Sequence, residues 1–197
     1  MYKRRKSSKY ISININLENS YFDCSDDWFI NNNILDYSYI TIKVKGKQRN
    51  RIFYAKNSEK YCSSFQPPDE VLINNIKKNY VHYEYDFEEE ENDVKLIWHN
   101  QVNFLGCSFL GCTKIVFADL SHFDSSNVVT ISSMFSGCNS LIYANFTNFK
   151  TSNCNAMNWM FYGCSSLISL DLSSFNTESV RSIDRMFEGC NNLQYIN

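Results

Sequence analysis

Apolar residues recur at matching offsets along the second half of the chain, with a period of 26 residues. A fixed period of this length is typical of stacked-repeat proteins, in which each unit buries its apolar face against its neighbours. Such proteins normally act through a surface, so we expect a binding or structural role. Each unit is marked by a cysteine in the phrase Phe-x-Gly-Cys, at Cys112, Cys138, Cys164 and Cys190.

Within one unit the spacing of the apolar residues changes. Leu170 and Leu172 alternate with polar residues, which predicts a short strand with one buried face. From Val180 onward the spacing becomes three, three and one, which predicts a short helical or 3₁₀ turn. The predicted fold class is therefore an α/β repeat solenoid, a leucine-rich-repeat-like stack of short parallel strands and short helices preceded by a small β-rich capping domain.

The repeated phenylalanines and cysteines are expected to form buried ladders. Phe123, Phe149 and Phe175 share one offset, which favours a buried spine over an exposed aromatic platform. The four period-marking cysteines are expected to be free, buried thiols, because a ladder does not converge tetrahedrally on a metal. Cys24 and Cys62 could pair in an oxidising compartment. A nearby group matches no common zinc-finger spacing, so we predict no metal site: Cys107, Cys112, His99 and His122.

The first half of the chain has a different pattern of apolar and polar residues. Residues 10–93 contain several alternating or β-branched runs, which predict a β-rich domain that caps the repeats. Residues 94–197 are assigned to about four repeats, the last incomplete, after a degenerate unit that begins near Val94. Residues 1–9 form a basic segment, which we interpret as a flexible tail.

Composition and charge argue against several classes of function. A net charge of −2 and a pI of about 5.9 give no electrostatic case for nucleic acid or an anionic membrane. No apolar run is long enough for a transmembrane segment or for the core of a signal peptide. With three histidines and no recognisable catalytic or phosphate-binding motif, we expect neither an enzyme nor a cofactor.

Residues 160–175 read MFYGCSSLISLDLSSF. This string resembles the repeated motif of the BspA-like leucine-rich-repeat surface proteins, and the resemblance covers residues 94–197. Members of that family are described as cell-surface or secreted proteins of bacteria and some protists that take part in adhesion. The resemblance therefore implies a surface location and an adhesive role for this chain.

Outward-facing strand positions are the candidate partner-binding residues, because side chains on one strand face stack across successive units. A protein or a glycan could bind such a ribbon. The alternative is that the same residues are only solvated, hydrogen-bonded members of the stack. The candidate positions are Phe117, Asp119, Ser121, Tyr143, Asn145, Thr147, Ser169, Asp171, Ser173, Tyr195 and Asn197.

The sequence thus favours a surface or secreted interaction module that binds a protein or glycan through this ribbon. The alternative is an intracellular scaffold that binds a peptide or assembles with copies of itself, for which a cytoplasmic location would follow. The chain stops within the fourth strand, at Asn197, and the open last unit could support self-association.

Overall fold

The structure is a computed structural model that describes residues 37–54, 62 and 64–197. The chain divides into the units Met1–Leu35 and Asp36–Asn197. All of the described residues belong to the second unit. The expectations for the tail at residues 1–9 and for Cys24 lie outside the described residues.

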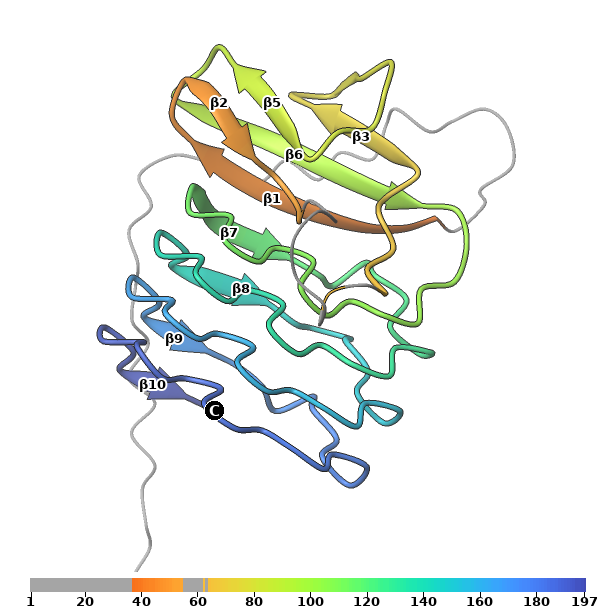
Figure 1. Cartoon of the computed structure of the whole chain (residues 1–197), viewed down its shortest axis with the longest axis vertical. Helices are drawn as coiled ribbons and strands as arrows, with labels where there is room; N and C mark the ends of the chain where they lie inside the picture. Colours follow the sequence, from red (N-terminus) through yellow and green to blue (C-terminus); the bar gives the residue numbers. More distant parts are fainter. Residues whose placement is uncertain (1–36, 55–61, 63) are drawn as a thin grey trace, which may run out of the picture. The chain divides into compact units, whose positions relative to one another are not determined.

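Ten strands make up the regular structure of the described residues, and they form three sheets (Figure 1). The largest sheet has six strands in the order β4-β3-β6-β1-β7-β8, and the pairs β2-β5 and β9-β10 form two small sheets. The strands are β1 (Ser38–Lys45), β2 (Gln48–Arg51), β3 (Glu70–Ile73), β4 (Ile76–Lys77), β5 (Glu84–Phe87), β6 (Glu91–Trp98), β7 (Ile115–Asp119), β8 (Tyr143–Asn145), β9 (Ser169–Leu170) and β10 (Tyr195–Ile196).

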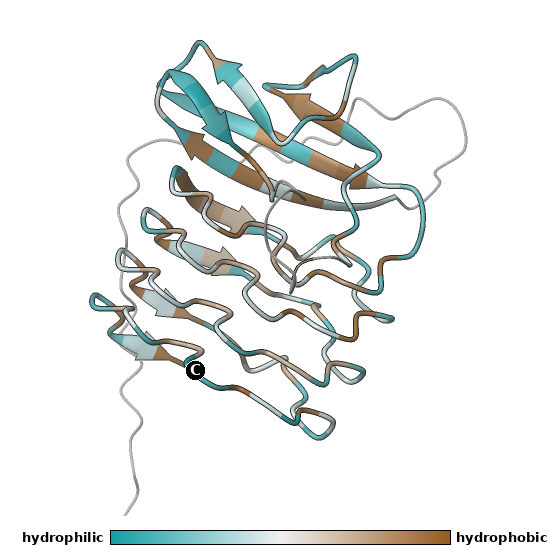
Figure 2. Ribbon diagram, in the orientation of Figure 1, coloured by the Kyte–Doolittle hydropathy of each residue, from teal (hydrophilic) through white to brown (hydrophobic). Residues whose placement is uncertain are grey.

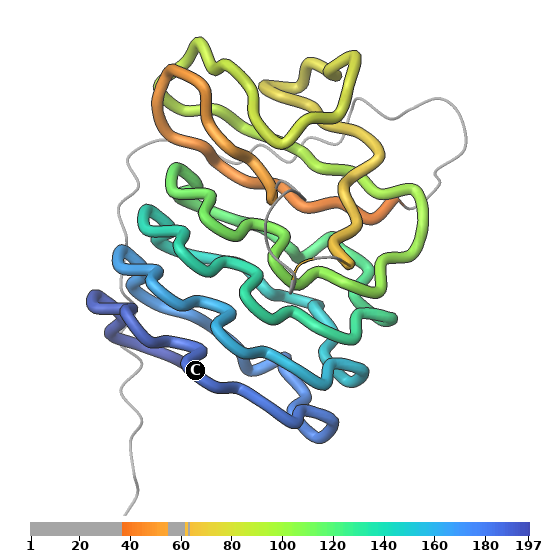
Figure 3. The backbone as a smooth tube through the Cα atoms, in the orientation of Figure 1, coloured from red at the N-terminus to blue at the C-terminus, as the bar shows by residue number. Residues whose placement is uncertain are grey.

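The predicted fold class is wrong. No α-helix occurs in residues 37–54 or 64–197, and the segments that were expected to be short helices are successive turns. The six-stranded sheet is mixed, because β7 and β8 are parallel whereas β1, β3, β4 and β6 pair antiparallel. The molecule is therefore not a leucine-rich-repeat solenoid of parallel strands and helices. Its 26-residue period instead produces a stack of coils built from short strands and turns, as the tube in Figure 3 shows.

Backbone hydrogen bonds explain why the turns do not become helices. In the coil that follows β7, the amides of Ser133 and Phe135 donate to the next coil, at Asn158 and Met160, over 2.8 Å each. The intervening amides of Met134 and Ser136 donate three residues back within their own coil, over 3.2 Å each. A helix would need consecutive amides to bond four residues back along the same segment. Every second amide is committed to the neighbouring coil, so a helix cannot form.

The same alternation fixes the backbone conformation. The turn segment of each coil contains two left-handed residues four apart, and the second of them is always glycine. These glycines also lie against one another, since a Cβ added to Gly189 would come within 3.1 Å of the Cα of Gly163. Glycine suits these sites because it adopts positive φ without steric cost. The left-handed pairs are Cys107 and Gly111, Ser133 and Gly137, Trp159 and Gly163, and Arg185 and Gly189.

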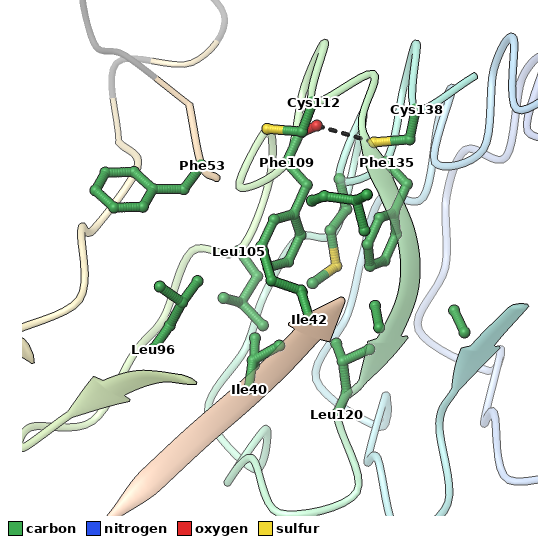
Figure 4. Close-up of a cluster of buried hydrophobic side chains, with 14 of the residues drawn as sticks. Ile40, Ile42, Phe53, Leu96, Leu105, Phe109, Cys112, Leu120, Phe135 and Cys138 are labelled. Atoms are coloured by element: carbon green, nitrogen blue, oxygen red, sulfur yellow. Dashed lines mark hydrogen bonds between the residues drawn. The ribbon is translucent and has the colours of Figure 1, made fainter. Parts of the chain in front are cut away.

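Strand β1 joins the first half of the chain to the coils. It lies between β6 and β7 and pairs antiparallel with both, so the predicted cap and the repeats share one sheet. Val94 belongs to β6, and parallel pairing starts after it, with the isolated bridge between Phe104 and Thr130 and then with β7. Apolar and polar residues alternate along β1, visible as alternating colours in Figure 2, and its buried side chains include Ile40 and Ile42. Figure 4 shows these two side chains beside Leu96 and Leu120.

The predicted buried ladders are confirmed in the inner coils. In the predicted spine, Phe123 and Phe149 are buried and Phe175 is half-buried, and the three rings stack at centroid distances of 6.4 and 6.1 Å. A second ladder of Phe109, Phe135 and Phe161 has no exposed surface, and its rings stack at 5.0 and 5.8 Å. The thiol of Cys138 donates to the carbonyl oxygen of Phe109 over 3.0 Å (Figure 4). Cys164 repeats this bond to the carbonyl of Phe135 over 3.1 Å. A small thiol donor at this offset thus satisfies a carbonyl of the preceding coil.

Truncating a ring in the spine should damage the fold severely. Phe149 is 1% exposed and stacks between the rings of Phe123 and Phe175, with Phe146 against its edge. We expect Phe149→Ala to lower the free energy of unfolding by roughly 3 to 5 kcal/mol, because it opens a cavity in a packed core. The control Ile142→Ala, at a side chain that is 43% exposed, should cost less than about 1 kcal/mol. Equal shifts in a urea titration would contradict the assigned inward face.

Candidate interaction surface on the strand face

The outward residues of the coil strands form two rows. Phe117 aligns with Tyr143 on the neighbouring strand, and Ser169 aligns with Tyr195 in the β9-β10 pair. We call Phe117, Tyr143 and Tyr195 the aromatic row. Polar candidates at the ends of the strands and in the turns after them form the second row. We call it the polar row: Asp119, Ser121, Asn145, Thr147, Asp171, Ser173 and Asn197.

Hydrogen bonds within the stack occupy much of the polar row. One carboxylate oxygen of Asp119 accepts a bond from the backbone amide of Ser121 over 2.9 Å and from the side chain of Asn145 over 3.0 Å. Asp171 accepts the equivalent bonds from Ser173 over 2.9 Å and from Asn197 over 3.3 Å. Each side chain thus closes the turn that follows its strand and also links two coils.

The polar row therefore has a structural role whether or not it binds a partner. The hydroxyl and the amide of Thr147 both donate to the side-chain oxygen of Asn145, over 2.7 and 3.1 Å, so the same turn closure recurs in the middle coil. Hydrogen bonds from Ser173 hold the pKa of the Asp171 carboxyl below its usual range. Asp171 is consequently a charged acceptor that is already engaged at neutral pH.

The aromatic row stacks through its rings. The rings of Phe117 and Tyr143 stack at a centroid distance of 5.9 Å, and both side chains are half-buried. Tyr195 is 59% exposed. Burial raises the pKa of Tyr143, and the negative charges of Asp171 and Asp119 raise it further. Its hydroxyl therefore stays protonated at neutral pH and can both donate and accept a hydrogen bond.

The same face continues onto the first half of the chain, for which the sequence predicts only a capping role. Lys43 on β1 aligns with Phe117, and its ammonium group lies 3.1 Å from a carboxylate oxygen of Asp93. The ring of Tyr39 stacks on that of His122 at 4.8 Å, and the ammonium nitrogen of Lys95 lies 3.7 Å from the Tyr39 ring centroid. The strict alternation in the run Ser38–Lys45 was the signal that could have identified these outward residues.

We use the name strand-face surface for the aromatic row, the polar row, Ser169 and the outward residues of the two cap strands. Those cap residues are Tyr39, Thr41, Lys43 and Lys95. Together they present aromatic rings, amines, hydroxyls and carboxylates on one side of the coils and of the six-stranded sheet.

The other clusters of polar side chains are internally paired. A small open pocket is lined by residues of the β2-β5 region, where the guanidinium of Arg49 bonds to Glu84 over 3.2 Å. His99 lies 3.0 Å from Glu70, and His122 contacts the hydroxyl of Ser121 at the same distance. In the part of the chain that the structure describes, no three His, Cys, Asp or Glu side chains are grouped to hold a metal ion.

The cysteines fall into two chemical classes. Cys62 forms a disulfide with Cys107, so the pairing of Cys62 with Cys24 that the sequence allowed is wrong. Five free cysteines remain in the described chain, of which four are buried and Cys190 is half-buried. Burial raises the pKa of the Cys154 thiol to about 11 and raises those of Cys112 and Cys138 further. These thiols are protonated at neutral pH and are poor nucleophiles.

Alkylation should separate these classes. At pH 7.5 we expect iodoacetamide to leave Cys112, Cys138, Cys154 and Cys164 unmodified in the folded protein, because they are buried and protonated. Cys190 should react faster than these four, and all five should react in urea. Peptide mass spectrometry would measure the extent at each site. Rapid modification of Cys138 in the folded protein would contradict the placement of the ladder.

Comparison with known proteins gives one match. Residues 103–196 match the family model described as "Mycoplasma protein of unknown function, DUF285". That description assigns the family no activity, and the match lies on the coils. No curated protein and no solved structure matches the chain. The described residues contain no helix that could cross a membrane. The similarity therefore falls on the part of the chain in which the 26-residue period is found.

Proposed function

We propose that this chain is a non-enzymatic interaction module that binds a protein or glycan through its strand-face surface. The observation that carries the proposal is the continuity of that surface from β6 through β1 to the coils. Aromatic side chains contribute much of the energy of interfaces at a small loss of side-chain entropy. Tyr39, Tyr143 and Tyr195 supply such side chains from both halves of the described chain.

A non-enzymatic role is favoured by the positions of the histidines. The three histidines lie in separate connecting segments: His82 precedes β5, His99 follows β6 and His122 follows β7. Their rings contact the backbone of Glu84, the carboxylate of Glu70 and the hydroxyl of Ser121 respectively. General acid–base catalysis requires such a group to converge with a nucleophile or a substrate pocket. His82 lines the small open pocket of the β2-β5 region, but no serine, threonine or cysteine is among the residues that line it. The buried thiols are also unsuitable as nucleophiles, because burial keeps them protonated.

The disulfide supports a cell-surface or secreted location. Disulfides persist mainly in oxidising compartments, and the bond between Cys62 and Cys107 joins the first coil to the segment that precedes β3. The five free cysteines are the observation that favours an intracellular scaffold instead. Four of them are buried, and burial alone would keep them from oxidising. The disulfide is therefore the more informative of the two features, and the surface location is the one we propose.

Paired variants would test the strand-face surface. The intact chain is applied to immobilised extracellular-matrix proteins, each presented before and after enzymatic deglycosylation. We expect Tyr143→Ala/Tyr195→Ala to weaken the binding by at least about tenfold, because truncation of an aromatic anchor typically costs more than 1 kcal/mol. The control Ile76→Ala/Tyr80→Ala changes two residues that are not part of this surface. Their side chains are 65% and 66% exposed.

The control variant should bind as the intact chain does, and circular dichroism should show that both variants are folded. Loss of binding after deglycosylation would identify the ligand as a glycan, and retention would identify it as protein. Undiminished binding by the folded Tyr143→Ala/Tyr195→Ala variant would refute the strand-face surface as the binding site.

A further inference from the structure

Two exposed aromatic residues lie on a different part of the coils. Trp159 is 43% exposed and Tyr162 is 38% exposed, and the amide of Tyr162 donates to the carbonyl of Trp159 over 3.1 Å. They belong to the turn segment of the third coil, which follows the parallel bridge residue Ala156 and precedes β9. We call Trp159 and Tyr162 the turn-edge pair. Neither residue is part of the strand-face surface.

The backbone at Trp159 is unfavourable for a large side chain. Its φ is +54°, in the left-handed region that bulky residues rarely adopt. The conformation itself is required, because the amide of Trp159 donates to the carbonyl of Asp184 in the next coil over 2.9 Å. The indole ring is not required by the fold, since Ser133 and Arg185 occupy the equivalent positions of the neighbouring coils at φ values of +56° and +54°. A tryptophan that is 43% exposed, at a strained position where the neighbouring coils hold other residues, is therefore a candidate for a functional role.

The turn-edge pair also departs from the repeat. Core offsets keep their apolar character from coil to coil because they maintain the stack. At the two offsets of the turn-edge pair, the preceding coil has Ser133 and Ser136, and the following coil has Arg185 and Glu188. Exposed positions that do not repeat are free to specialise, so the aromatic residues are a property of this one coil.

The surroundings of the pair indicate the chemistry of a ligand. Ser133 and Ser136 hold the equivalent positions of the preceding coil, and in the following coil the guanidinium of Arg185 is 3.7 Å from the carboxylate of Glu188. A sugar ring presents an apolar C–H face to an aromatic ring and hydroxyl groups around its edge, which need both donors and acceptors. A protein interface needs a wider apolar core, since each partner typically buries about 800 Å². Two aromatic side chains among polar ones match a sugar better than a protein.

We propose that Trp159 and Tyr162 form a saccharide-binding subsite on the turn edge of the third coil. The subsite is separate from the strand-face surface and does not depend on it. Sugar rings stack on the two aromatic side chains, while Ser133, Arg185 and Glu188 bond to the hydroxyl groups at their edges. No charge on the saccharide is required, because Arg185 and Glu188 offset each other.

Titration with soluble oligosaccharides would test this subsite. The probes are maltohexaose, cellohexaose, N-acetylchitohexaose and sialyllactose, with binding followed by calorimetry and by the indole N–H signal of Trp159 in NMR spectra. We expect at least one probe to bind and to shift that signal, and Trp159→Ala to weaken its Kd by at least about tenfold. The matched control Ile142→Ala removes a side chain with the same 43% exposure and should leave the Kd within about twofold.

Failure of the subsite and failure of the strand-face surface are distinguishable. Tyr143→Ala/Tyr195→Ala should leave oligosaccharide binding at the turn edge unchanged. The subsite would be refuted if no probe shifts the Trp159 signal, or if Trp159→Ala and Ile142→Ala behave alike. It would also be refuted if Trp159→Ala abolishes binding to an enzymatically deglycosylated protein, because the pair would then be a protein contact.

A structural role for the indole has its own test. Glycine adopts the left-handed conformation without a steric penalty, so Trp159→Gly should leave the midpoint of thermal unfolding unchanged or raise it. The same variant should lose oligosaccharide binding to the extent that Trp159→Ala does. A fall in the midpoint as large as that of Phe149→Ala would show that the indole stabilises the fold, and would overturn the assignment.

Discussion

The fold depends on the alternation of backbone hydrogen bonds between neighbouring coils and the turns within each coil. In the three inner turn segments, one amide donates across the stack and the next donates three residues back. Each such bond contributes only about 1 kcal/mol net, but an unpaired buried amide would cost about 1 to 3 kcal/mol. The alternation satisfies the backbone of a segment that is neither helix nor sheet, and it imposes the two left-handed residues of each turn segment.

Side chains reinforce this arrangement at the same period. Cysteine thiols satisfy phenylalanine carbonyls of the preceding coil, and buried hydroxyls satisfy amides of the following one. The hydroxyl oxygen of Ser125 accepts a bond from the amide of Lys150 over 2.6 Å, and Thr151 does the same for Asn176 over 2.7 Å. At the other end, β1 satisfies the edge of the first coil in the antiparallel sense. The core is thus continuous from the first half of the chain to the coils.

The sequence predicted which side chains are buried better than it predicted the backbone. For example, the repeat predicts that Val128, Ile131 and Met134 face inward, and their side chains have no exposed surface. The helix prediction failed because an apolar spacing of three also arises from successive turns, and spacing does not show where each amide bonds. The insertion of β1 between β6 and β7, and the bond between Cys62 and Cys107, are contacts between segments far apart in sequence. A local sequence pattern cannot predict such long-range contacts.

The sequence also predicted the candidate surfaces only in part. Alternation placed the aromatic row correctly on an outward face, but it could not show that the carboxylates of Asp119 and Asp171 close turns and link coils. Trp159 was missed because aligning the repeats emphasises positions that recur, and this residue differs from its equivalents Ser133 and Arg185. Its significance depends on φ and exposure, which follow only from the structure.

The turn segments bond across the stack and not along a helix. NMR scalar couplings across hydrogen bonds identify each donor and acceptor directly. The structure predicts a coupling between the amide nitrogen of Phe135 and the carbonyl carbon of Met160, whose oxygen accepts that amide over 2.8 Å. A coupling from Phe135 to the carbonyl carbon of Ile131, four residues back, would show a helix and contradict the account.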